Sequence, residues 1–166
     1  HPLLDAISDL APIDAENFKK EYGLNDKEII ALLPGSREQE VEKMLSLMLS
    51  VRDYFKNYQF VIAGAPSLPK EFYQKFVDDD VHFVSNKTYD LLRCSKAALV
   101  TSGTATLETA LLNIPEIVCY RTSTISYEIG KRVVKNIKFI SLVNLIMDRE
   151  IVKELIQKEL NTENLV

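Results

Sequence analysis

The chain has no tryptophan and only two cysteines and two histidines among its 166 residues. Because no Cys or His cluster has ligand spacing, the sequence argues against a metal site. Cys94 and Cys119 stand in apolar surroundings, so we expect buried thiols of a reducing compartment rather than a disulfide. No apolar run approaches the roughly 20 residues that a membrane-spanning helix needs.

An excess of positive charge is also absent, although charged residues are plentiful. The 20 lysines and arginines are outnumbered by 24 aspartates and glutamates, which gives a net charge of −4. This balance argues against a general nucleic-acid-binding protein. The length suits one domain with a core of its own. Because residue 1 is His rather than Met, we expect the chain to begin inside a longer protein.

Short apolar runs alternate with amphipathic ones along most of the chain. The alternation predicts a doubly wound, Rossmann-like parallel sheet of about six strands with helices on both faces, an α/β fold. Residues 1–28 are expected to be a lead-in of loop and helix. The predicted strands are 29–33, 60–63, 81–84, 97–100, 117–120 and 139–142, and the predicted helices are 37–55, 70–77, 89–94, 105–112, 125–134 and 150–160.

The first strand-to-helix turn contains Gly35, Ser36 and Arg37. It has neither the G-x-G-x-x-G fingerprint nor the P-loop pattern. Nevertheless, glycine lets a ligand approach the backbone, serine can cap the helix, and arginine can bind phosphate oxygens. The turn therefore suits a phosphate, although the same residues also suit an ordinary turn with a surface arginine.

A second turn follows the fourth predicted strand and is richer in hydroxyl groups. Its residues are Ser102, Gly103, Thr104, Ala105 and Thr106, with Glu108 about one helical turn further on. Free N–H groups and the positive end of the helix dipole favour a diphosphate there. The carboxylate of Glu108 could accept both hydroxyls of a ribose. The alternative is a helix cap with an acidic first turn.

Three other features are ambiguous on their own. Arg121 follows the fifth strand and is either a surface arginine or part of the same site. Asn144 is either a turn residue or a ligand contact. The basic set Lys131, Arg132, Lys135 and Lys138 complements a helix C-terminus or lies against an anionic membrane surface.

Together these residues resemble the lipid-A-disaccharide synthase family. The resemblance rests on the runs 32–37, 40–42, 102–108 and 120–121, and on 140–146, 149–150 and 154–157. The opening residues 1–5 are similar to the family's G-H-P-L-x-D hinge segment, without its glycine. The resemblance covers nearly all of the chain. Val143 and Asp148 depart from it, since the family usually has Pro and Gly there, and both flank Asn144.

The resemblance implies the C-terminal, UDP-sugar-binding half of an inverting, metal-independent GT-B glycosyltransferase. The whole enzyme would transfer a sugar from UDP-2,3-diacylglucosamine to 2,3-diacylglucosamine 1-phosphate (lipid X), releasing UDP. It would need no cofactor and would work in the cytoplasm, at the inner membrane of a Gram-negative bacterium. The acceptor site and the general base would belong to an N-terminal domain that this chain lacks. The implied donor-binding residues are Gly35, Ser36, Arg37, Ser102, Gly103, Thr104, Ala105, Thr106, Glu108, Arg121 and Asn144.

Two other classes of function stay open at this point. A related UDP-N-acetylglucosamine 2-epimerase or peptidoglycan transferase would share a UDP-binding turn, but lacks the run from Ser141 to Asn144 with Arg149 and Glu150. Alone, the fragment is a possible non-catalytic nucleotide-binding module. The alternation alone also fits a flavodoxin-like or receiver-type domain. A receiver, however, needs acidic residues after its first strand, and residues 34–37 there are Pro, Gly, Ser and Arg.

Overall fold

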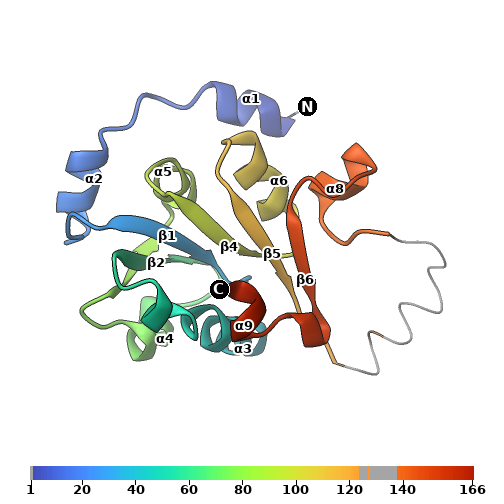
Figure 1. Cartoon of the computed structure of the whole chain (residues 1–166). Coiled ribbons are helices and arrows are strands. Elements are labelled where there is room, and N and C mark those ends of the chain that lie inside the picture. The colour runs from blue at the N-terminus through green and yellow to red at the C-terminus, as the bar shows by residue number, and fades with distance from the viewer. Residues whose placement is uncertain (1, 124–126, 128–137) are drawn as a thin grey trace.

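A computed structural model describes residues 2–123, 127 and 138–166 of the chain. Its centre is a six-stranded sheet in the order β3-β2-β1-β4-β5-β6 (Figure 1). Every neighbouring pair of strands is parallel. The strands are β1 (Glu28–Leu33), β2 (Tyr58–Gly64), β3 (Val81–Ser85), β4 (Ala97–Thr101), β5 (Glu116–Tyr120) and β6 (Lys153–Ile156). This arrangement confirms the predicted doubly wound fold.

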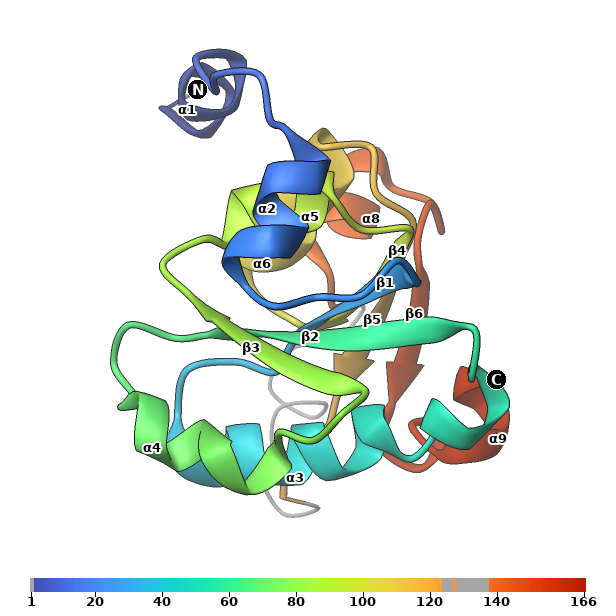
Figure 2. The ribbon, with the colours of Figure 1, turned by 90° about the vertical axis from the view of Figure 1, so that its left-hand side faces the viewer.

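Helices cover both faces of the sheet (Figure 2). One face carries α3 (Glu38–Leu49), α4 (Lys70–Tyr73) and α9 (Thr162–Leu165), and the other carries α1 (Pro2–Ser8), α2 (Ala15–Glu21), α5 (Thr88–Arg93), α6 (Thr104–Leu111) and α8 (Leu142–Met147). Single 3-10 turns lie at η1 (Arg52–Tyr54), η2 (Gln74–Phe76) and η3 (Gln157–Glu159). Among the described residues, no helix is long and apolar enough to cross a lipid bilayer.

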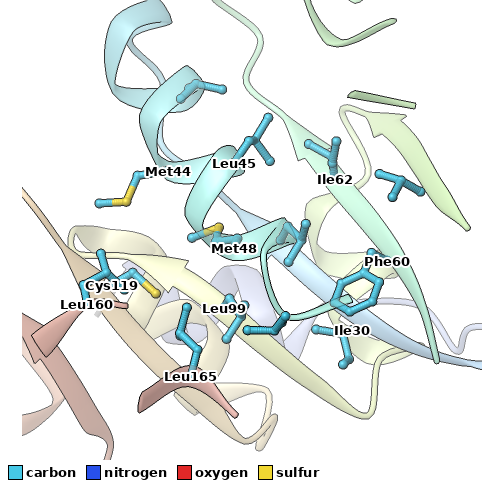
Figure 3. Close-up of a cluster of buried hydrophobic side chains, with 14 of the residues drawn as sticks. Ile30, Met44, Leu45, Met48, Phe60, Ile62, Leu99, Cys119, Leu160 and Leu165 are labelled. Carbon is cyan, nitrogen blue, oxygen red and sulfur yellow. The ribbon is translucent and has the colours of Figure 1, made fainter. Parts of the chain in front are cut away.

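Strand β1 shows why the sheet needs two helical layers. Ile30 and Leu32 pack into the cluster formed with α3 and α9, part of which Figure 3 shows. Ile29, Ala31 and Leu33 point to the opposite face and pack with α2 and α5. Because successive strand residues face opposite sides, a strand buried on both faces must be apolar throughout. This is why the continuous apolar runs were readable as parallel strands.

The first five predicted strands are confirmed, but the sixth is misplaced. Residues 139–142 were expected to be a strand, yet Ser141 caps α8, and its hydroxyl accepts a hydrogen bond from the Asn144 N–H. The sixth strand is Lys153–Ile156, within the segment 150–160 that was predicted to be helical. The strand was missed because Glu154, a buried carboxylate, occupies a position where a strand usually has an apolar residue.

The other predicted helices need smaller corrections. The helix expected over 37–55 ends at Leu49, and η1 follows it. The one expected over 70–77 is α4 followed by η2. The helix expected over 125–134, and three of the four basic residues singled out near it, lie outside the described residues. The two lead-in helices α1 and α2 agree with the expectation for residues 1–28.

The cysteines are free thiols, with Cys119 buried and Cys94 half-buried. Asp148 ends α8 in the left-handed region, with φ of 48°. This is a conformation that glycine adopts without strain. The glycine that the resemblance implies at position 148 would therefore suit this helix end. Val143, the other departure, is buried within α8. The α8 segment therefore accommodates both departures.

Candidate functional site

A cavity of about 310 Å³ opens at the carboxyl ends of the central strands. The chain runs from β1 outward through β2 to β3 and then returns to place β4 beside β1 (Figure 1). Ligands of open α/β sheets bind at such a reversal of strand order. The cavity is lined by Leu33, Gly35, Ser36, Glu40, Ala63, Gly64, Ala65, Pro66, Thr88, Thr101, Ser102, Gly103, Thr104, Ala105 and Glu108.

The first turn contributes a glycine with a positive φ, and a carboxylate of α3 lies against it. Gly35 has φ of 103°, a conformation that favours glycine. A β-carbon on Gly35 would stand 2.8 Å from Oε2 of Glu40. The carboxylate of Glu40 therefore lies against this turn and lines the cavity. Arg37 is exposed at the N-cap of α3 and is not among the lining residues.

The second turn leads from β4 into the eight-residue helix α6. No atom lies within 4 Å of the place a β-carbon of Gly103 would take, so the backbone here is open to a ligand. The Thr106 hydroxyl is buried and donates to the Gly103 carbonyl at 2.8 Å. It therefore fixes the turn rather than facing the cavity. The Thr106 N–H donates to the Gly103 carbonyl at 3.3 Å, which leaves the N–H groups of Thr104 and Ala105 as those that a helix start does not pair within the helix; they carry its partial positive charge.

Thr101, the last residue of β4, is the residue that sequence reasoning missed at this site. It lines the cavity and is only 6% exposed. Its hydroxyl has no hydrogen-bond partner among the described residues. An unmatched buried hydroxyl costs free energy unless a ligand or water satisfies it. Its place at the end of the strand that feeds the second turn was the available signal.

Glu108 is held by a neighbouring phenol. The Tyr89 hydroxyl donates to Oε1 of Glu108 at 2.8 Å. Burial, and then this bond to the carboxylate, raises the pKa of Tyr89 to about 12, so the phenol stays a donor. A second hollow, of about 450 Å³, continues from the first and shares Thr88 and Glu108 with it. Leu10, Asn86, Lys87, Tyr89 and Asp90 complete its lining.

The structure brings seven of the predicted site residues to one cavity: Gly35, Ser36, Ser102, Gly103, Thr104, Ala105 and Glu108. It does not bring Arg121 there. The Arg121 guanidinium donates to the carbonyls of Gln157 and Leu160, at 3.0 and 2.6 Å. Those contacts tie the end of β5 to η3.

Asn144 is also kept away from the cavity, because it is fully buried and its amide is saturated. Its Nδ2 donates to the Val152 carbonyl and to Glu154 Oε1, each at 2.8 Å. Its Oδ1 accepts from the N–H groups of Ile151 and Val152. The surroundings of Asn144 give it a structural role. Within the described residues, no group of three or more His, Cys, Asp or Glu could hold a metal ion.

Comparison with known proteins gives consistent findings. A family model described as lipid-A-disaccharide synthetase matches residues 1–166. A lipid-A-disaccharide synthase of Persephonella marina is 38% identical over 99% of this chain and 46% of the relative. One of Syntrophus aciditrophicus is 38% identical over 99% of this chain and 45% of the relative. The chain thus spans about half the length of the curated relatives it matches.

Two solved structures share the fold. A Methanocaldococcus jannaschii UDP-GlcNAc 2-epimerase, in complex with UDP-GlcNAc and UDP, gives a TM-score of 0.60 at 11% identity, over 98% of this chain and 44% of that one. WaaG, a glycosyltransferase involved in lipopolysaccharide biosynthesis, gives a TM-score of 0.57 at 17% identity, over 95% of this chain and 42% of that one. These likenesses confirm the predicted fold class.

Proposed function

The chain belongs to the lipid-A-disaccharide synthetase family, and from that premise we propose that its cavity binds the uridine diphosphate of a nucleotide-sugar donor. The observation that carries this proposal is the donor set at the second turn. The N–H groups that begin α6 and the Thr101 hydroxyl, for which no partner is found among the described residues, belong to residues that line one cavity. Both are hydrogen-bond donors suited to phosphate oxygens.

In this proposal the diphosphate lies over the second turn and the ribose lies at Glu108. Tyr89 holds one oxygen of the Glu108 carboxylate, so the other is free to accept from a ribose hydroxyl. The hollow beyond Thr88 and Glu108 is then the place for the base. Arg37 is exposed beside the cavity and would reach the diphosphate from solvent.

The whole enzyme would transfer the sugar of UDP-2,3-diacylglucosamine to lipid X. As the bond between sugar and diphosphate breaks, negative charge grows on the leaving phosphate. In this proposal the N–H groups of α6, its dipole and Arg37 would stabilise that charge. The acceptor and the general base would come from the remaining half of the protein. Because both substrates are lipids, we also propose that the enzyme works at the cytoplasmic face of the inner membrane.

Titration calorimetry of the purified chain with UDP tests the proposal. Glu108→Ala should weaken UDP binding by about tenfold to a hundredfold, since a hydrogen bond to a charged group contributes about 1.5–3 kcal/mol. Glu163→Ala, which removes an exposed glutamate on α9, is the matched control. Unchanged UDP affinity in a folded Glu108→Ala variant would remove Glu108 from the site. Failure of the folded wild-type chain to bind UDP would overturn the proposed donor site.

Thr101→Val should weaken UDP binding by about fivefold to tenfold without lowering the melting temperature. Valine keeps the shape of threonine, and the hydroxyl that it removes has no hydrogen-bond partner to lose among the described residues. The measurement is the UDP affinity beside a thermal unfolding curve. Thr109→Val is the control, because the buried Thr109 hydroxyl donates to the Ala105 carbonyl inside α6. If both variants bind UDP like the wild type, Thr101 does not face the ligand.

The isolated chain could instead be a nucleotide-binding module without activity. Adding the other half of the protein distinguishes a transferase domain from a non-catalytic nucleotide-binding module. Restored release of UDP from the donor in the presence of lipid X supports the transferase, whereas UDP binding without turnover in the reconstituted protein supports the module.

A further inference from the structure

Glu40 places a second carboxylate in the proposed nucleotide cavity. It belongs to α3, on one face of the sheet, whereas Glu108 belongs to α6 on the other face (Figure 2). Both line the same cavity. The cavity therefore has a carboxylate on each of its two sides, with the N–H groups and hydroxyls of the second turn as its other polar groups.

Capping of α3 does not account for the position of Glu40. No hydrogen bond or ion pair of its carboxylate is found among the described residues. Its neighbours behave differently, since Glu42 pairs with Lys75 and Glu38 points to solvent. The Glu40 carboxylate instead lies against Gly35, where any side chain would meet it. Gly35 and the half-buried Glu40 both line the cavity, so the Glu40 carboxylate is an acceptor at the cavity for which no partner is found among the described residues.

A carboxylate in this place limits what can lie beside it. It repels a phosphate and cannot donate a hydrogen bond to one. Hydroxyl groups are its natural partners, because each can donate a strong, charge-assisted hydrogen bond. A donor nucleotide has hydroxyls at its two ends, on the ribose and on the sugar, with the diphosphate between them. With the ribose at Glu108, the hydroxyls that remain for Glu40 are those of the sugar.

We propose that the carboxylate of Glu40 accepts hydrogen bonds from the hydroxyl groups of the donor's hexose and so orients the sugar in the cavity. This inference rests on the proposed function, because it takes the nucleotide to lie with its ribose at Glu108. It makes Glu40 a specificity residue for a glycosylated nucleotide over the free nucleotide. Repulsion between Glu40 and the diphosphate works in the same direction, since it disfavours a donor shifted toward the first turn.

The test compares two soluble probes, UDP and UDP-GlcNAc, by titration calorimetry at fixed salt. Glu40→Ala should weaken UDP-GlcNAc binding about tenfold or more, while UDP binding stays the same or becomes up to severalfold tighter because a negative charge is lost. Glu40→Gln keeps an acceptor oxygen and should retain part of the preference. Glu38→Ala removes an equal charge from the same helical turn but away from the cavity, and should leave both affinities unchanged.

The outcomes separate the inference from the proposed function. If Glu40→Ala binds UDP but keeps the wild-type ratio of the two affinities, Glu40 does not contact the sugar. Equal tightening of both ligands would mean that Glu40 acts only by repelling phosphate, which also overturns the inference. If the folded wild-type chain binds neither ligand, the proposed function fails first. A fall in UDP-GlcNAc affinity alone, with the melting temperature unchanged, supports the inference.

Discussion

Replacing Asn144 by alanine should lower the free energy of unfolding by about 3–5 kcal/mol. The side chain is fully buried and makes four hydrogen bonds: it accepts two from backbone N–H groups and donates two. Alanine leaves those partners unmatched, and each unsatisfied buried group costs about 1–3 kcal/mol. Water entering beside the exposed residue Ile151 would offset part of the loss. Denaturant unfolding measures the change.

The control for this prediction is Asn164→Ala. Asn164 is an exposed residue whose amide donates a single hydrogen bond, to the Glu159 carbonyl. Its loss should cost less than about 1 kcal/mol. Below the melting transition, Asn144→Ala should bind UDP as the wild type does, since Asn144 does not line the cavity. A stable Asn144→Ala variant with weak nucleotide binding would contradict the structural role and return Asn144 to the donor site.

The second large effect concerns Glu116, at the start of β5. The residue is 8% exposed, and neither carboxylate oxygen has a partner among the described residues. It lines an apolar hollow with Phe55 and Leu165. Burial raises the pKa of Glu116 to about 8. In the unfolded chain its pKa is about 4.3.

This shift makes stability fall as pH rises. Below about pH 4 both states hold the proton, and Glu116 contributes no pH dependence. Between about pH 4.3 and 8 the unfolded chain has lost the proton while the folded protein keeps it. Each pH unit in this range therefore lowers the free energy of unfolding by up to about 1.4 kcal/mol. Above that range the loss is complete. Glu116→Gln should therefore be about 2–4 kcal/mol more stable than the wild type at pH 8, and similar to it near pH 4.

Urea unfolding at a series of pH values checks the slope. Glu28→Gln is the matched control, because Glu28 starts the central strand β1 but is exposed to solvent and 3.8 Å from Lys96. At each pH, the free energy of unfolding of that variant should stay within about 1 kcal/mol of the wild-type value. If Glu116→Gln unfolds with the same pH dependence as the wild type, Glu116 is solvated in solution and its carboxylate is not buried.

The sheet was predictable because the signal for each strand lies in residues that are adjacent in the sequence. Strands such as β1 are apolar at every position after the first, and turns with Gly or Pro end them. The exception, β6, has Glu154 in its interior. Four donors satisfy this carboxylate: the N–H groups of Ile140 and Ser141, the Ser141 hydroxyl and the Asn144 amide. These partners lie 10–14 residues away in sequence, so no local pattern could reveal that a charged residue was buried.

The site was predictable in part for the same reason. Gly103 and Glu108 follow a strand and open a helix, which places them at the carboxyl edge of a parallel sheet. Whether a polar side chain faces the cavity or the protein depends on contacts made after folding. The Thr106 hydroxyl donates to the Gly103 carbonyl, whereas Thr101 lines the cavity and its hydroxyl has no partner among the described residues, although both are buried threonines of the same segment. Arg121 finds carbonyls of η3, 36 and 39 residues further along the chain.

The Glu154 network has a consequence for how this edge of the protein folds. Strand β6 carries a carboxylate that accepts hydrogen bonds from Ile140, Ser141 and Asn144 at the start of α8, and α8 is anchored by that same carboxylate. If β6 left the sheet alone, the α8 donors would lose their shared acceptor; if α8 left alone, the carboxylate would stay in the sheet without partners. The strand and the helix therefore open and close as one cooperative unit.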